Sequence, residues 1–499
     1  MDGLGRVGGG QNWALVPRPV EVVPNGDTFT VAPGVEIHAH GEAMEVARYL
    51  AGVLRSVTGL EMPVRAPGGE SAGGNAPAGL IRLVAGTADA RLGLEGYALS
   101  ATESDLTISA LAPAGLVRGV QTLRQLLTPG PTGWTVPGGH IRDYPRFPYR
   151  GLMLDVARHF FPVPAVRRVI DLAALYKINH LHLHLTDDQG WRIAIDKWPR
   201  LASYGGATEV GCGPGGFYTK AEYREIVEYA ARHFITVVPE VDIPGHTNAA
   251  LASYPELTCD GVAPPRYTGV EVGFSSLCVG KEITYRFLDD VFGELAELTP
   301  GPYLHIGGDE AKTLSSDEYA VIVERAQEIV AAHGKAPIGW HEIAAAKLLP
   351  ASLVQYWGVE HVAEQVAAAS ASGNPVIMSP ANRTYLDMKY DEASPLGLSW
   401  AGHIDVRTAY EWDPLAFLSG VDPGSVAGVE APLWTETVSE IAEVEYLAFP
   451  RLAAIAEVAW SPAAVQDWTD FAGRLAGQAR LWRALGIRFF PAPEIRWPA

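Results

Sequence analysis

The sequence of 499 residues contains only three cysteines, and it has no run of 18 apolar residues. Because a membrane-spanning helix needs about 20 consecutive apolar residues, we expect no transmembrane segment. No Cys-x-x-Cys pair occurs, which argues against a zinc site built from thiolates. Basic residues are also scarce, since 38 lysines and arginines face 57 aspartates and glutamates, for a formal net charge of −19. This balance disfavours nucleic acid or a membrane surface as a partner.

The segment MDGLGRVGGGQNW at the beginning has no apolar stretch of the kind found in signal peptides. We therefore expect a protein that is either cytoplasmic or secreted with its export signal replaced. Cys259 and Cys278 lie in one loop rich in glycine and proline. A disulfide between them would add roughly 3 kcal/mol of stability and favour secretion. On spacing alone, two unrelated thiols remain the alternative.

Residues 1–142 are expected to form a non-catalytic α+β domain. VEVVPNGDTFTVAP predicts a hairpin around Asn25-Gly26, and GYALSATESDLTISA predicts a second hairpin. Helical spacing is expected at 42–57 and 116–127. The proline-rich segment IRDYPRFPYRG then indicates a boundary, so residues 143–499 form the second predicted domain, with helices at its C-terminal end.

After this boundary, the pattern changes to alternating strands and helices. The predicted strands are Gly151–Val156, His180–Leu185, Thr236–Val241, Tyr303–Ile306, Pro337–Trp340, Leu353–Trp357, Val376–Met378 and Ala427–Ala431. Eight such alternations predict an α/β fold, a (β/α)8 TIM barrel preceded by the smaller α+β domain. An open doubly wound sheet is the alternative, but no glycine-rich phosphate fingerprint follows a first strand.

Catalytic groups of such barrels lie where the strands end. Polar or aromatic residues follow seven of the eight predicted strands. They are Arg158, Asp187, Asp242 with His246, Asp309 with Glu310, Trp340, Trp357, and Trp434 with Glu436. Indole rings stack on the apolar face of a sugar, and charged groups bind its hydroxyls. The set therefore predicts a sugar-binding site.

HLHLHLTDDQGWR (180–192) also allows a metal site, because its alternate histidines lie on one face of a strand. These histidines fill the strand interior, however, and no further histidine pair complements them. We expect hydrogen-bonded core histidines, with no metal and no cofactor.

YLHIGGDE (303–310) places Asp309 and Glu310 side by side at a strand end. Glycosidases usually hold two carboxyls about 5 Å apart for retention or about 6.5–9.5 Å apart for inversion. Consecutive residues on an extended chain point to opposite sides, so this pair is not expected to flank one anomeric carbon. Glu310 could instead reach the glycosidic oxygen while Asp309 reaches a group on carbon 2. Substrate-assisted hydrolysis requires that arrangement, with a 2-acetamido carbonyl as the nucleophile.

These segments resemble glycoside hydrolase family 20, the β-N-acetylhexosaminidases, and most of all the secreted actinobacterial type. The resemblance spans nearly the whole chain and includes RGLMLDVARHF, HLHLTDDQGWR, PEVDIPGH, HIGGDE and RLAAIAEVAWS. It implies exo-acting hydrolysis of terminal β-linked GlcNAc or GalNAc, with retention and through an oxazolinium-type intermediate. It also implies a Cys259–Cys278 disulfide and a secreted protein.

The resemblance assigns Glu310 as general acid and then base, Asp309 as partner of the acetamido N–H, and Tyr385 as donor to the acetamido oxygen. The further residues that it implies are Trp340, Trp357 and Trp434 for the acetamido pocket and sugar floor, Arg158, Asp387 and Glu436 for ring hydroxyls, Asp187, Asp242 and His246 as supporting groups, and Trp400 for the leaving group.

Three alternatives remain at this stage: an inactive sugar-binding barrel, a metal hydrolase, and a family member that releases disaccharides. A chitinase of the related substrate-assisted family would carry a D-x-x-D-x-D-x-E run, which does not occur. The natural substrate (chitin oligomers, glycans or cell-wall fragments), the preference between GlcNAc and GalNAc, and the oligomeric state stay open.

Overall fold

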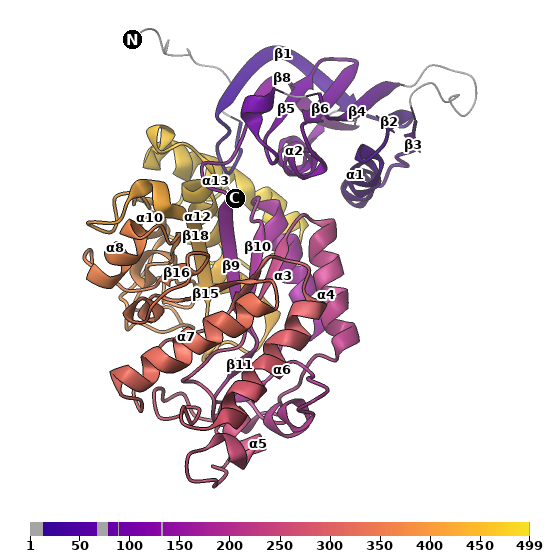
Figure 1. The fold of residues 1–499 in the computed structure, drawn as a ribbon. Helices are drawn as coiled ribbons and strands as arrows, with labels where there is room; N and C mark the ends of the chain where they lie inside the picture. Colours follow the sequence, from indigo (N-terminus) through magenta and orange to yellow (C-terminus); the bar gives the residue numbers. More distant parts are fainter. Residues whose placement is uncertain (1–12, 67–77, 88, 131–132, 499) are drawn as a thin grey trace. The chain divides into compact units, whose positions relative to one another are not determined.

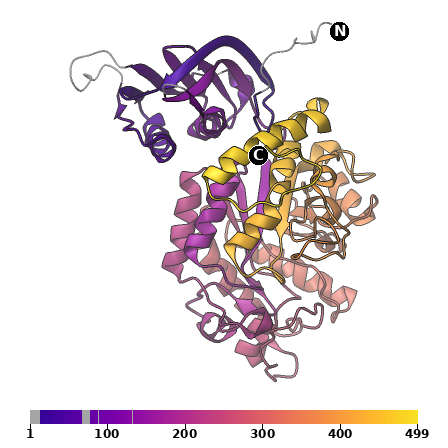
Figure 2. The ribbon, with the colours of Figure 1, turned by 180° about the vertical axis from the view of Figure 1, so that it is seen from behind.

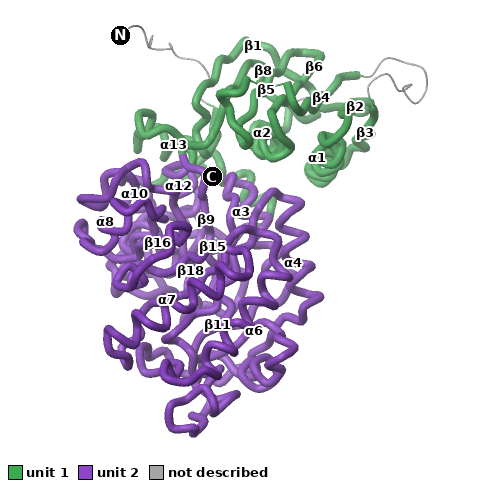
Figure 3. The backbone as a smooth tube through the Cα atoms, viewed as in Figure 1, with its two compact units in different colours: residues 1–146, 460–486, 493–499 green, residues 147–459, 487–492 purple. Residues whose placement is uncertain are grey.

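The computed structural model describes residues 13–66, 78–87, 89–130 and 133–498. The chain divides into two compact units, coloured in Figure 3. The first comprises residues 1–146, 460–486 and 493–499, and the second comprises 147–459 and 487–492. The sequence predicted a boundary at 142/143; in this division the corresponding boundary is 146/147, and residues 460–486 and 493–499 group with the N-terminal segment.

The first unit is a mixed sheet with two helices, α1 (Ala43–Thr58) and α2 (Pro113–Leu126), packed against it (Figure 1). Its strands are β1 (Glu21–Val31), β2 (Val35–Ala39), β3 (Val64–Arg65), β4 (Gly79–Ala85), β5 (Tyr97–Ala101), β6 (Asp105–Ala110), β7 (Thr128–Gly130) and β8 (Gly133–Asp143). The order is β1-β8-β5-β6-β4-β2-β3, with β7 on β8. Unit 1 also includes α13 (Trp468–Ala484), whose Arg474 Nη1 donates to the Leu15 carbonyl at 2.7 Å.

The hairpin expected at 96–110 is present as the antiparallel pair β5–β6. The hairpin expected around Asn25-Gly26 is absent. β1 instead runs through this dipeptide as one strand, and its pairing with β8 shifts register between Pro24 and Thr28. The Asn-Gly pair thus produces a local irregularity and not a chain reversal, because β8 supplies the partner strand from more than 100 residues away.

The second unit is a closed barrel of eight parallel strands in the order β10-β13-β14-β15-β16-β17-β18-β9 (Figures 1 and 2). The strands are β9 (Tyr149–Asp155), β10 (His180–His184), β13 (Thr236–Glu240), β14 (Tyr303–His305), β15 (Ala336–Trp340), β16 (Leu353–Tyr356), β17 (Val376–Met378) and β18 (Val426–Leu433). A short antiparallel pair, β11 (Thr186–Asp187) and β12 (Gly190–Trp191), follows β10. The predicted barrel is confirmed, and each predicted strand overlaps one of these eight.

Helices surround the strands. They are α3 (Val163–Leu175), α4 (Lys220–Arg232), α5 (Asn248–Ser253), α6 (Glu282–Leu298), α7 (Ser316–Ala332), α8 (Glu364–Ala371), α9 (Ala381–Thr384), α10 (Val406–Tyr410), α11 (Ile441–Ala448) and α12 (Arg451–Trp460). Capping boxes start α4 at Thr219 with Glu222 and α7 at Ser315 with Glu318. Within the described ranges, no helix combines the length and apolar character that a membrane crossing requires.

Candidate active site

All eight barrel strands deliver a predicted site residue at or just beyond their C-terminal ends. Arg158 follows β9, Asp187 follows β10, Asp242 follows β13, Asp309 and Glu310 follow β14, Trp340 ends β15, Trp357 follows β16, Tyr385 and Asp387 follow β17, and Trp434 and Glu436 follow β18. Because parallel strands end at the same face of a barrel, residues nearly 300 positions apart are brought together there.

A cavity of about 310 Å³ lies at this face. Ten of the predicted residues line it: Arg158, Asp309, Glu310, Trp340, Trp357, Tyr385, Asp387, Trp400, Trp434 and Glu436. The other three, Asp187, Asp242 and His246, are buried and contact the lining residues from behind. The lining also includes Val270, Val272 and Leu398, which the sequence did not single out. They lie in loops without regular spacing, so no periodic pattern marks them.

The two glycines of the YLHIGGDE segment let the chain turn sharply after β14. Gly307 has φ +67° and Gly308 has φ +111°, both in the region that favours glycine. The Gly308 N–H donates to Asp242 Oδ1 at 3.2 Å, which ties this turn to the end of β13. Glu310 itself has φ +49°, uncommon for a residue with a side chain. The turn thus places Asp309 and Glu310 on the cavity wall.

Asp309 and Asp242 form a buried carboxyl pair. Burial and then the negative charge of Asp309 raise the pKa of Asp242 far above its ordinary value. Burial and the charges of Glu240 and Glu310 also raise the pKa of Asp309, while His246 opposes this rise. We assign the proton of this pair to Asp242, because burial and the charge of Asp309 raise its pKa more strongly than that of Asp309 is raised. Asp309 therefore keeps a carboxylate that can accept an N–H.

His246 links the two acids to the interior. Its Nδ1 lies 3.2 Å from Asp187 Oδ1, and its Nε2 lies 3.5 Å from Asp309 Oδ2 and 3.7 Å from Glu310 Oε2. Burial opposes its charge, but Asp187 and Asp309 raise the pKa of His246 to about 9. An imidazolium at neutral pH therefore stands behind the acid pair.

Asp187 joins this histidine to Arg158, whose Nη2 lies 2.8 Å from Asp187 Oδ2. Despite burial, Arg158 and His246 hold the pKa of Asp187 well below its ordinary value. The guanidinium also lies over the Trp434 ring, 4.7 Å from its centroid. These contacts fix Arg158 at the edge of the cavity.

Glu310 has a second charged neighbour on the outer side. Lys312 Nζ donates to Glu310 Oε1 at 2.9 Å, and the lysine side chain is 60% exposed. Such an exposed pair contributes little stability. Because Lys312 is exposed, this pair does not hold Glu310 firmly in one position.

Aromatic rings form the wall of the cavity. Trp340 and Trp434 lie 5.6 Å apart, and Trp400 meets both Trp357 (5.9 Å, 80°) and Tyr385 (5.8 Å, 86°) edge to face. Trp340 is fully buried, whereas Trp400 is 55% exposed. The wall therefore has a buried part at Trp340 and an outer part at Trp400 that is open to solvent.

Carboxylates anchor two of these rings. The indole N–H of Trp340 donates to Glu240 Oε1 at 2.8 Å, and that of Trp357 donates to Glu342 Oε2 at 3.0 Å. Burial and then the charge of Asp309 raise the pKa of Glu342 to about 8. Neither glutamate was predicted, because no sequence pattern marks either one: Trp340 lies 100 residues from Glu240, and Trp357 lies 15 residues from Glu342.

Buried polar atoms without a partner among the described residues converge on the cavity. They include Arg158 Nε, Asp309 Oδ1, Asp387 Oδ2 and Glu436 Oε2. Burial and the neighbouring charge of Glu436 raise the pKa of Asp387, and burial raises that of Glu436. Since unpaired buried polar groups are costly, this ring of donors and acceptors suits a ligand rich in hydroxyls.

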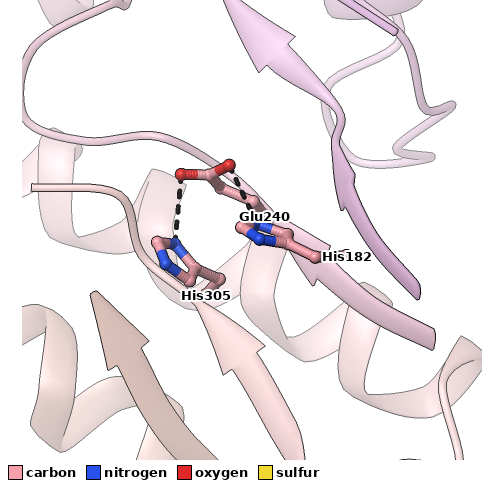
Figure 4. A group of neighbouring side chains, drawn as sticks. All are labelled: His182, Glu240 and His305. Atoms are coloured by element: carbon pink, nitrogen blue, oxygen red, sulfur yellow. Dashed lines mark hydrogen bonds and ion pairs between the residues drawn. The ribbon is translucent and has the colours of Figure 1, made fainter. Parts of the chain in front are cut away.

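A metal site was the alternative for the core histidines. His182, Glu240 and His305 lie close enough together to hold an ion, and Figure 4 shows the carboxylate between the two rings. Both nitrogens of His182 face carboxylates, Glu430 at 2.8 Å and Glu240 at 3.0 Å, so both carry protons. Nδ1 of His305 accepts the Gly307 N–H at 3.0 Å. With both nitrogens committed to carboxylates, His182 has no lone pair left for a metal, and the cluster is a hydrogen-bonded network in the barrel core.

The predicted disulfide is confirmed. Cys259 and Cys278 are bonded, and their Cα atoms lie 4.9 Å apart. The bridge closes the loop that carries Val270 and Val272 to the cavity. The third cysteine, Cys212, is exposed and not in a disulfide.

Comparison with known proteins identifies the family. Residues 147–320 and 315–463 match the glycosyl hydrolase family 20 catalytic domain, and residues 12–144 match domain 2 of the same family. The chain belongs to glycosyl hydrolase family 20. Its relatives include a beta-N-acetylhexosaminidase from Cellulomonas fimi, 45% identical over 97% of each chain.

Solved structures of this family superpose closely. The GH20 beta-N-acetylhexosaminidase from Streptomyces coelicolor A3(2) is 52% identical, with a TM-score of 0.93 over 98% of this chain and 99% of that chain. A mutant Streptomyces plicatus beta-hexosaminidase in complex with the product GlcNAc is 51% identical, with a TM-score of 0.93 over 98% of each chain. The expectation of a family 20 glycoside hydrolase of the β-N-acetylhexosaminidase type is confirmed.

Proposed function

We propose that this enzyme removes single β-linked GlcNAc or GalNAc residues from the non-reducing ends of glycans, with retention and by substrate-assisted catalysis. The observation that carries the proposal is the pair Asp309-Glu310, which lines one cavity together with Tyr385 and an indole wall. In this proposal the two acids serve two parts of one sugar, Glu310 the glycosidic oxygen and Asp309 the acetamido group on carbon 2.

In this mechanism, Glu310 protonates the glycosidic oxygen as the acetamido carbonyl oxygen attacks carbon 1. The bond from carbon 1 to the leaving oxygen breaks, and a bond from the acetamido oxygen to carbon 1 forms an oxazolinium ion. Asp309 accepts the acetamido N–H and stabilises the positive charge that develops there. Tyr385 donates its O–H to the acetamido oxygen, which holds that oxygen in its attacking position. Glu310 then deprotonates the water that opens the ring at carbon 1.

The remaining lining residues hold the sugar. Arg158, Asp387 and Glu436 carry the unpaired polar atoms that meet ring hydroxyls. Trp340, Trp357 and Trp434 enclose the acetamido group and the pyranose face. Trp400, which is largely exposed, stacks on the leaving group. A volume of about 310 Å³ is at the small end for ligand pockets, which favours exo cleavage of one residue at a time over release of disaccharides.

Secretion is part of the proposal. The Cys259–Cys278 disulfide supports it, because structural disulfides persist in oxidising compartments and are rare in the cytosol. Chitin oligomers, glycans and cell-wall fragments all present the required terminal sugar, and the substrate class is therefore defined by the 2-acetamido group.

The test compares aryl β-GlcNAc and aryl β-GalNAc with aryl β-glucoside, which lacks the acetamido group but has the same leaving group. Hydrolysis of the first two and loss of the third, by at least about three orders of magnitude in kcat/KM, is expected if the substrate supplies the nucleophile. Similar rates on glucoside, or capture of a glycosyl ester on an enzyme carboxylate, would overturn the mechanism.

A further inference from the structure

Glu240, at the end of β13, is a buried carboxylate with several polar partners near the site. Its Oε1 accepts the Trp340 indole N–H at 2.8 Å. Its Oε2 lies within hydrogen-bond distance of both His182 Nε2 and His184 Nδ1. Oε1 also lies 3.1 Å from His305 Nδ1, so one oxygen contacts the indole and His305 while the other contacts His182 and His184 (Figure 4 shows Glu240 with His182 and His305).

The histidine side of Glu240 leads to the catalytic acids. His184 Nε2 lies 2.9 Å from Asp187 Oδ2, the oxygen that also binds Arg158 at 2.8 Å. Asp187 Oδ1 in turn faces His246, which stands behind Asp309 and Glu310. Cationic and anionic groups alternate along the whole path, so the position of each proton is set by the neighbours on both sides.

This polar path is not needed to fill the barrel. Barrel interiors are usually filled by branched apolar side chains, and replacing buried ion pairs by well-packed apolar groups is often neutral or stabilising. Glu240, His182 and His184 are each fully buried. We attribute the charged group at this fully buried position to a role in holding the site, beyond stability.

We propose that Glu240 is a positioning residue for the reaction. It fixes the Trp340 ring through the indole N–H, and it fixes Arg158 and His246 through His184 and Asp187. It touches neither the sugar nor the water in this account. The proposal rests on the proposed function, because its effect is read through hydrolysis of the acetamido sugar.

Glu430 provides a matched control. It is fully buried, it contacts the same His182 at 2.8 Å, and it accepts from Tyr149 O–H and Gln355 Nε2, both at 2.7 Å. Within the described part of the chain, its hydrogen bonds go to His182, Tyr149 and Gln355 and not to Trp340 or His184, and it does not line the cavity. A carboxyl-to-amide change at either glutamate removes one buried charge from the same cluster.

The experiment measures the melting temperature and the kcat and KM for aryl β-GlcNAc in the wild-type enzyme, Glu240→Gln and Glu430→Gln. The expected result is a loss of kcat/KM of about tenfold or more for Glu240→Gln, mainly in kcat. For Glu430→Gln we expect kcat/KM within about twofold of wild type, despite a comparable fall in melting temperature. Equal losses that follow stability, or no loss in Glu240→Gln, would overturn the proposal.

Two further comparisons keep the test decisive. If an amide variant does not fold, Glu240→Asp and Glu430→Asp retain the charge and repeat the comparison with the same expectation. A double-mutant cycle combines Glu240→Gln with Trp340→Phe. The fold loss of kcat/KM in the double variant should be smaller than the product of the two single fold losses, because both substitutions break the same hydrogen bond between the Trp340 indole and Glu240. Multiplicative losses would remove the link through Trp340. An inactive wild-type enzyme would instead overturn the proposed function itself.

Discussion

Gly307 lies so close to Asp242 that a Cβ atom on Gly307 would be 1.7 Å from Asp242 Oδ1. This approach is what lets the chain after β14 turn against the end of β13 and deliver the acid pair to the cavity. A side chain at position 307 is excluded by the neighbouring carboxyl and by the positive φ together.

Gly307→Ala should therefore destabilise the fold and reduce activity. A left-handed alanine costs about 1–2 kcal/mol, and overpacking adds about 1–3 kcal/mol. The matched control is Gly334→Ala, since Gly334 has φ +74° but no atom within 4 Å of an added Cβ. In denaturant unfolding, Gly334→Ala should lower the free energy of unfolding only by the cost of a left-handed alanine, about 1–2 kcal/mol. Its activity should equal that of the wild type. Equal costs at both positions would contradict the steric explanation.

Glu310→Gln should separate substrates by leaving group. Without an acid, hydrolysis of an unactivated disaccharide should fall by about 10²–10⁴-fold, whereas an aryl glycoside with a good leaving group should lose much less in its first step. Steady-state kinetics on both substrates measure this. If the two losses are the same, Glu310 does not act as the acid.

The carboxyl pair should respond unequally to amide substitution. Asp242→Asn mimics the protonated carboxyl that we assign to this position, so we expect kcat within about tenfold of wild type. Asp309→Asn removes the carboxylate that accepts the acetamido N–H, and a loss of about 10²-fold or more is expected. The measurement is kcat for aryl β-GlcNAc in the two variants. A larger loss in Asp242→Asn than in Asp309→Asn would mean that Asp309 holds the proton.

Stability should decline on the alkaline side of neutrality. Although burial opposes their charge, carboxylates raise the pKa of His182 to about 9, of His184 to about 10 and of His246 to about 9. A histidine whose pKa is higher in the folded state than in the unfolded state stabilises the fold while it is protonated in both states, below its unfolded pKa of about 6.5. This stabilisation is lost as the pH rises through the folded-state pKa values of about 9 to 10. Melting temperatures between pH 6 and 10 should fall accordingly, with the same profile in the surface variant His333→Asn. A flat profile from pH 7 to 10 would exclude buried imidazoliums.

Removing the disulfide should affect both stability and substrate binding. Cys259→Ser with Cys278→Ser should lower the free energy of unfolding by about 3 kcal/mol. It should also raise KM, because the released loop carries Val270 and Val272 to the cavity. Cys212→Ser, at the exposed free cysteine, should change neither quantity. An unchanged KM in the double variant would show that the loop holds its place without the bridge.

Much of the barrel could be predicted because each strand is a short apolar run that ends in a polar or aromatic residue. Val376–Met378 has the same bounds in the prediction and in the structure, and the other strands differ by a few residues. The residues at strand ends were found for the same reason, since parallel strands in a closed barrel must end together.

The parts that could not be predicted depend on distant partners. Glu240 follows a proline in an apolar strand, and only the indole and imidazole groups from three other strands give it a role. The Asn25-Gly26 dipeptide has the composition of a hairpin turn, but pairing with β8 keeps the strand continuous. Val270 and Val272 are ordinary loop valines until the disulfide and the cavity are known.

The grouping of α13 with the N-terminal segment has a consequence for biosynthesis. Arg474 and Gln478 of α13 donate to the carbonyls of Leu15 and Ala14, so the first unit is assembled from both ends of the chain. The ribosome delivers those ends hundreds of codons apart, with the whole barrel in between. Since domains generally fold as they emerge, the segment made first is completed last, and a premature stop before α13 would leave an early-made unit permanently unfinished.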